Sequence, residues 1–106
     1  MKRAILHITV VSMTFCTPLS AAAGGDPEAG KITFMTKGCD GCHGQAGYST
    51  TPALIPILAG RDEAYIIGQL WAFQAGLRSN PMMSPMATSV NEEEIINIAA
   101  YLAAQK

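Results

Sequence analysis

Apolar side chains recur at helical spacing in two stretches of the chain, and a third stretch has the end signals of a short helix. The first stretch predicts a helix over residues 62–75, and the second predicts one that follows Asn91 and runs toward the C-terminus. The two apolar stripes are Ile66, Ile67, Leu70 and Phe73, and Ile95, Ile98, Ala99 and Leu102. Asn91 is a good N-cap, with Glu94 at the capping-box position.

The third predicted helix covers residues 28–37. Asp26 is a suitable N-cap, Pro27 a suitable first helical residue and Gly38 the expected stop. Residues 39–43 can form one more helical turn after it. Since no segment alternates convincingly between apolar and polar positions, the sequence predicts an all-α protein.

Long loops separate these helices. Residues 44–60 and 77–90 are rich in glycine, proline and hydroxyl side chains, which is typical of irregular structure. Such long loops are unusual in a small domain and are commonly functional or wrapped around something.

The N-terminus has the pattern of a secretory signal peptide. Lys2 and Arg3 precede an apolar run over residues 4–15, and alanines at 21–23 form an A-x-A cleavage site. The run is too short for a membrane span. A lipid-modified Cys16 is an alternative, but the preceding residues lack the expected small side chains. We expect residues 1–23 to be cleaved, so that residues 24–106 form one exported domain with no membrane span.

Composition and charge argue against nucleic-acid binding. The 106-residue chain has a formal net charge of −1, and its basic residues are scattered rather than clustered as in proteins that bind nucleic acids. Once the signal is removed, Cys39 and Cys42 are the remaining cysteines.

The stretch "CDGCH", residues 39–43, carries the candidate chemistry. A structural zinc site needs four ligands, and the mature chain offers only three of the Cys and His type. A redox dithiol of the thioredoxin kind needs a preceding strand, and a plain disulfide leaves His43 unexplained. Covalent haem attachment explains all three residues: cysteines three apart lie on one side of a helical turn and can each bond one vinyl group, and His43 can coordinate the iron.

Residues 24–106 resemble a class I cytochrome c over nearly their whole length. The matching pieces are "DPEAGKITF", "CDGCHG", "PALIPILAG", "AYIIGQLWAFQAG" and "PMMSPMATSVNEEEIINIAAYLAAQK". The last two are most similar to single domains of bacterial di-haem cytochromes, and the chain is also similar to the haem subunits of flavocytochrome c sulfide dehydrogenases. The resemblance implies three main helices and long loops wrapped around one covalently attached haem.

The resemblance also implies roles for individual residues. His43 is the expected proximal ligand, oriented by a proline carbonyl that accepts its other ring N–H. Pro52 best matches that position, and Pro56 is the alternative. The first and last helices are expected to cross, with Gly30 and Phe34 on one side and Tyr101 and Leu102 on the other.

The expected sixth ligand is a methionine in the loop before the last helix. Met82, Met83 and Met86 lie there, whereas Met35 lies in the first predicted helix and fits core packing. In the di-haem relatives the earlier member of an M-x-x-M pair is the ligand. Met83 holds that place here, with Met86 and then Met82 as alternatives.

Some side chains have two possible roles. A haem propionate is a possible partner for Tyr65 or Trp71, although ordinary core packing explains both aromatic residues as well. Arg61 and Arg78 are either propionate partners or solvated surface charges.

The predicted function is that of a periplasmic one-electron carrier with a single His/Met haem, and not of an enzyme in its own right. Expected partners are redox proteins that bind transiently, or one flavoprotein or oxidase. The alternative is the haem subunit of an enzyme complex such as a flavocytochrome c sulfide dehydrogenase. An open sixth position, as in a haem enzyme or gas binder, is a third interpretation that the methionines oppose.

Overall fold

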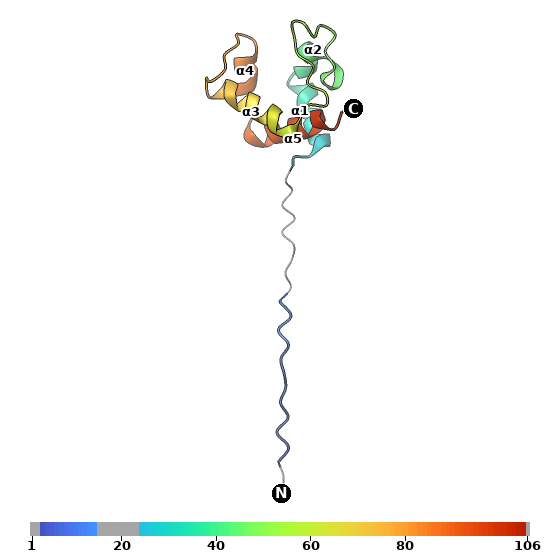
Figure 1. Cartoon of the computed structure of the whole chain (residues 1–106), viewed down its shortest axis with the longest axis vertical. Coiled ribbons are helices and arrows are strands. Elements are labelled where there is room, and N and C mark those ends of the chain that lie inside the picture. The colour runs from blue at the N-terminus through green and yellow to red at the C-terminus, as the bar shows by residue number, and fades with distance from the viewer. Residues whose placement is uncertain (1–2, 15–23, 106) are drawn as a thin grey trace.

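The computed structural model describes residues 3–14 and 24–105, and its regular elements are helices (Figure 1). Within these residues there is no β-strand. The elements are α1 (Pro27–Thr36), α2 (Cys39–His43), the 3₁₀ turn η1 (Gln45–Gly47), α3 (Glu63–Gln74), α4 (Met83–Thr88) and α5 (Glu92–Ala103). The three long helices and the extra turn at residues 39–43 therefore agree with the sequence prediction.

Helix α1 crosses α5, and this crossing forms the base of the domain. Gly30 makes the close approach possible, because a Cβ at this position would overlap the backbone carbonyl of Asn97. The rings of Phe34 and Tyr101 meet beside it, with centroids 5.7 Å apart. Phe34, Ile95 and Leu102 are the largest fully buried side chains, so the expected packing of the first helix on the last is confirmed.

The helix ends follow the expected chemistry. Asp26 accepts a hydrogen bond from the N–H of Glu28, and Asn91 and Glu94 form a complete capping box. Gly38 and Gly76 follow α1 and α3 with positive φ angles of 78° and 73°, which side-chain-bearing residues rarely adopt. Both glycines therefore end helices where the sequence predicted.

The loop prediction for residues 77–90 is wrong in part, because α4 lies inside it. Asn80 explains the difference: its side-chain oxygen accepts hydrogen bonds from the N–H groups of Met82 and Met83, at 2.9 and 3.0 Å. Its backbone carbonyl accepts from the N–H of Ser84 at 2.9 Å. Asn80 thus starts a helical turn that tolerates Pro85 near its beginning.

Residues 3–14 are extended and exposed, and lie away from the helices. None of the described helices is long and apolar enough to cross a bilayer. Cys16 and the expected cleavage site at residues 21–23 lie outside the described residues.

Candidate functional site: a thiol–imidazole turn and its supporting loops

The candidate site begins at α2, a five-residue helix that contains the whole "CDGCH" motif. Gly38, in the left-handed conformation, ends α1 and lets the chain start a new helical turn. Cys39 and Cys42 are three residues apart on that turn, and both thiols are free rather than joined in a disulfide. The turn therefore carries two separate free thiols at a spacing of three residues.

The two thiols have different surroundings. Cys39 is half-buried and packs against the hydrophobic core, whereas Cys42 is exposed. Burial raises the pKa of the Cys39 thiol, and the nearby Asp40 carboxylate adds to this effect. Cys39 is thus the anchored member of the pair and Cys42 the accessible one.

His43 is the buried polar side chain of the motif, with only 7% of its surface exposed. Its Nδ1 lies 3.0 Å from the backbone carbonyl oxygen of Pro56. A carbonyl oxygen can only accept, so the hydrogen bond requires the proton on Nδ1 and leaves the lone pair on Nε2. Histidines that bind metals through Nε2 have this tautomer, with the other ring N–H donated to a carbonyl or carboxylate that orients the ring.

The expectation that Pro52 supplies this carbonyl is therefore wrong, and the alternative, Pro56, is the hydrogen-bond partner. The backbone explains the choice. The N–H groups of Leu58 and Ala59 both donate to the carbonyl of Gly47, at 2.9 and 3.2 Å, and Gly60 donates to Leu102 at 2.8 Å. These bonds bring residues 56–60 back over α2, whereas Pro52 lies in an exposed turn.

The candidate methionines lie on or beside α4, at the other side of the domain from α2 in the view of Figure 1. Met83 is the first residue of α4 and Met86 lies one turn later; both are partly buried. Met82 is 70% exposed. The structure thus brings Cys39, Cys42, His43 and Pro56 together, and presents Met83 from a separate short helix packed on α3.

The arginines considered as propionate partners both stack on aromatic rings. The Arg61 guanidinium lies 5.0 Å from the ring centroid of Tyr65, and that of Arg78 lies 4.7 Å from the centroid of Phe73. Arg78 also donates to the side chain of Gln69. These contacts give both side chains a defined direction, and a role toward a propionate stays a prediction.

The donor set fits a covalently bound haem. Two free thiols on one turn can each form a thioether, and the Nε2 of His43 can bind iron. Large apolar side chains that suit the faces of a porphyrin are exposed on the loops and on α3: Leu54, Ile57, Trp71, Leu77 and Met82. Among the described residues, no three His, Cys, Asp or Glu side chains gather as a metal-binding group.

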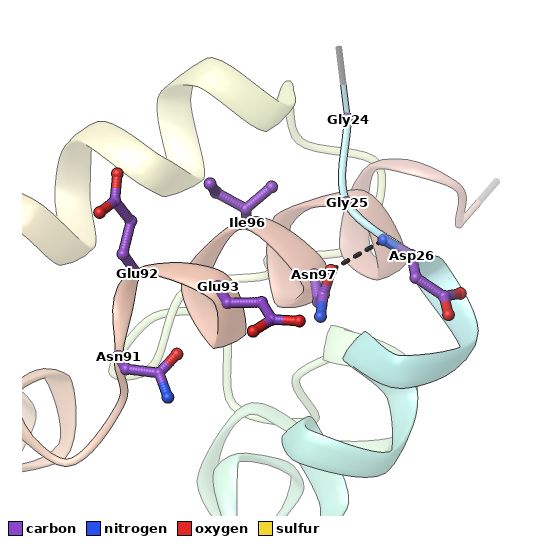
Figure 2. Close-up of a pocket in the computed structure, with 8 residues that line it drawn as sticks. All are labelled: Gly24, Gly25, Asp26, Asn91, Glu92, Glu93, Ile96 and Asn97. Atoms are coloured by element: carbon purple, nitrogen blue, oxygen red, sulfur yellow. Dashed lines mark hydrogen bonds between the residues drawn. The ribbon is translucent and has the colours of Figure 1, made fainter. Parts of the chain in front are cut away.

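A surface groove of about 600 Å³ lies outside this site, between residues 24–26 and the first turns of α5 (Figure 2). The backbone N–H of Asp26 donates to the side-chain oxygen of Asn97 across it, at 2.8 Å. Its lining offers carboxylates and amides but no thiol, imidazole or thioether. We assign this groove a structural role, because the hydrogen bond fixes the chain entry to α5.

Comparison with known proteins agrees with a haem-binding site in this chain. The family model described as cytochrome c matches residues 27–106. Cytochrome c4 of Thiocapsa roseopersicina is 41% identical over 76% of this chain and 41% of its own length. The thiosulfate dehydrogenase electron acceptor of Stutzerimonas stutzeri is 42% identical over 62% of this chain and 31% of its own length. The chain thus spans well under half of these relatives.

A shorter relative is matched almost completely. Cytochrome c-554(548) of Halomonas halodenitrificans is 34% identical over 77% of this chain and 99% of its own length.

Solved structures give the same result. Cytochrome c4 of Acidithiobacillus ferrooxidans superposes with a TM-score of 0.66 at 33% identity, covering 74% of this chain and 49% of that one. Thiosulfate dehydrogenase TsdBA of Marichromatium purpuratum gives a TM-score of 0.68 at 32% identity, covering 76% of this chain and 19% of that one. The fold is that of a class I cytochrome c, as expected, and the chain belongs to the cytochrome c family.

Proposed function

We propose that this protein is a one-electron carrier with a single haem c, attached through Cys39 and Cys42 and ligated by His43 and Met83. The observation that carries the proposal is the geometry of His43. Its Nδ1 is hydrogen-bonded to the Pro56 carbonyl, so Nε2 is the ring nitrogen left to bind iron, on the same short helix as two free thiols.

A haem with His and Met ligands supplies a reversible Fe(III)/Fe(II) couple whose potential the thioether raises. The chain's own residues contribute orientation and environment. Pro56 fixes the plane and the tautomer of the His43 ring. The half-buried Cys39 anchors one side of the attachment to the core, and Asn80 holds the backbone of Met83 at the start of α4.

We further propose that the protein works in the periplasm after cleavage of residues 1–23. The support is the basic, apolar and small-residue pattern of that segment. Partners are redox proteins that bind briefly over a small interface.

A second function is favoured by the relatives. Two of them are named thiosulfate dehydrogenase electron acceptor, and one structural neighbour is a thiosulfate dehydrogenase. The alternative of a haem subunit or dedicated electron acceptor of a thiosulfate dehydrogenase rests on these names. The alternative of a flavocytochrome c sulfide dehydrogenase subunit rests on the sequence resemblance alone. Co-purification of a second chain with the tagged protein from its native host would support this alternative over a free carrier.

The intact mass tests the central proposal. Protein expressed with its signal in a strain that matures cytochromes should be recovered from the periplasm at the mass of residues 24–106 plus one haem. Cys39→Ala with Cys42→Ala is the matched control and should carry no covalent haem. A wild-type mass equal to the bare polypeptide, or a haem that acid acetone extracts, would overturn covalent attachment.

A further inference from the structure

We propose that Gln74 is a positioning residue for the sixth ligand: it holds α4 against α3 and thereby keeps the Met83 sulfur at the iron. The inference rests on the proposed Met83 ligation. Gln74 is the last residue of α3 and has no role in the candidate donor set.

The amide nitrogen of Gln74 donates to two backbone carbonyls at once. It lies 2.8 Å from the oxygen of Ala87 and 2.9 Å from that of Val90. Both acceptors are carbonyl oxygens, so the NH₂ end of the amide must face them and both of its protons are used. Ala87 and Val90 are themselves buried.

These two carbonyls lie where α4 ends and the chain turns into α5. The last carbonyls of a helix have no partner within the helix and need one from elsewhere. Here the backbone carbonyls of Pro85 and Met86 accept hydrogen bonds from the nearby hydroxyls of Thr88 and Ser89. The carbonyls of Ala87 and Val90 accept from the side chain of Gln74 in α3. The carbonyl of Ser89 accepts from the Nζ of Lys37, which follows α1, at 3.0 Å.

Such outside support matters because α4 has only six residues. A helix this short has little stability of its own, so its position depends on tertiary contacts. At the start of α4, Asn80 holds Met82 and Met83 from within the same connection. At its end, Gln74 ties the helix to a long helix of the core. Loss of this tie would loosen the element that presents Met83, without touching Met83 itself.

Two substitutions remove the tie in different ways. Gln74→Leu keeps the approximate bulk and removes both donors. Gln74→Glu keeps the length but sets a carboxylate, which can only accept, against two carbonyl oxygens. Gln105→Leu is the matched control: the Gln105 side chain donates a hydrogen bond to the carbonyl of Tyr101 near the end of α5, away from α4.

The readout is displacement of the methionine by added imidazole, measured on each ferric holoprotein. Imidazole binds only when the sulfur has left, so its apparent affinity scales with the fraction of open iron. We expect imidazole to bind Gln74→Leu and Gln74→Glu about tenfold more tightly than the wild type, equivalent to about 1.4 kcal/mol. The thioether-to-iron charge-transfer band should weaken in the same variants, and Gln105→Leu should match the wild type.

The outcomes separate the two proposals. A wild-type protein without the thioether band contradicts Met83 ligation itself, and with it the basis of this inference. A wild type with the band, and Gln74 variants with unchanged imidazole affinity, contradicts the positioning role alone. A lower melting temperature with unchanged imidazole affinity counts against it too, because ordinary packing would produce that result. If Gln74→Leu yields no holoprotein, the same criteria apply to Gln74→Glu.

Discussion

His43 shows how one hydrogen bond selects the chemistry of a side chain. The carbonyl of Pro56 places the ring proton on Nδ1, and the neutral ring then has its lone pair on Nε2. Burial excludes water from the ring, since 7% of the residue is exposed. The motif in the sequence identifies the histidine, but this contact with the loop decides which ring nitrogen is left free to bind a metal.

The proposed sixth ligand is also a single side chain, that of Met83. We expect Met83→Ala to abolish the thioether-to-iron band and to lower the reduction potential, because thioether ligation favours the ferrous form. Met82→Ala is the neighbouring control and should change neither, since Met82 is 70% exposed. Ferric spectra and potentiometric titration of the holoproteins measure both effects. If the band persists in Met83→Ala and disappears in Met86→Ala, the ligand is Met86.

At the scale of elements, the crossing of α1 over α5 is set by a residue without a side chain. Gly30 is buried and faces the backbone of Asn97 directly. The aromatic pair of Phe34 and Tyr101 fills the next layer of the same contact. The distance between the two helices is therefore fixed by backbone contact, and any added atom must push them apart.

We expect Gly30→Ala to destabilise the holoprotein by about 2–3 kcal/mol, the usual cost of overpacking a well-filled contact. Gly68→Ala is the matched control in the interior of α3, where an added Cβ would meet nothing within 4 Å. It should be stabilising by about 0.5–1 kcal/mol, because alanine restricts the unfolded chain and favours helix. Denaturant unfolding gives both values; equal stability of Gly30→Ala and wild type would refute the close-contact explanation.

At the scale of the whole molecule, the helices enclose a small core. In the described part of the chain, the large fully buried side chains are Phe34, Ile95 and Leu102. Several apolar side chains on the loops and on α3 are exposed, among them Leu54, Trp71 and Leu77. A domain of this length has a marginal core when it depends on its own side chains. A large apolar cofactor that binds only the folded chain would add its binding energy to stability.

The double variant Cys39→Ala with Cys42→Ala tests this dependence on haem. We expect its purified haem-free chain to be largely disordered, with weak helical circular dichroism and no cooperative thermal transition. Wild-type holoprotein should melt cooperatively under the same conditions. A sharp, native-like melt of the haem-free variant would show that the helices pack stably by themselves.

Much of the fold follows from local chemistry that is visible in the sequence. Helical periodicity, the Asp26 and Asn91 caps and the glycines at 38 and 76 determine where the three long helices begin, and where the first two end, to within one residue. The spacing within residues 39–43 is also local, so the pair of thiols and the histidine could be identified without coordinates.

Contacts between distant segments were decided only by the tertiary structure. Pro56, rather than Pro52, reaches His43 because the carbonyl of Gly47 receives two backbone donors and folds the loop back. Helix α4 starts through local chemistry, because Asn80 caps it at a spacing of two and three residues, and the sequence carried that signal. Its end depends on a distant segment, since Gln74 at the end of α3 donates to the carbonyls of Ala87 and Val90. Periodicity and capping patterns report on residues within a few positions of one another. Hydrogen bonds between segments 11 to 16 residues apart depend on how the loops close over the core, and that closure is set by packing of the whole chain.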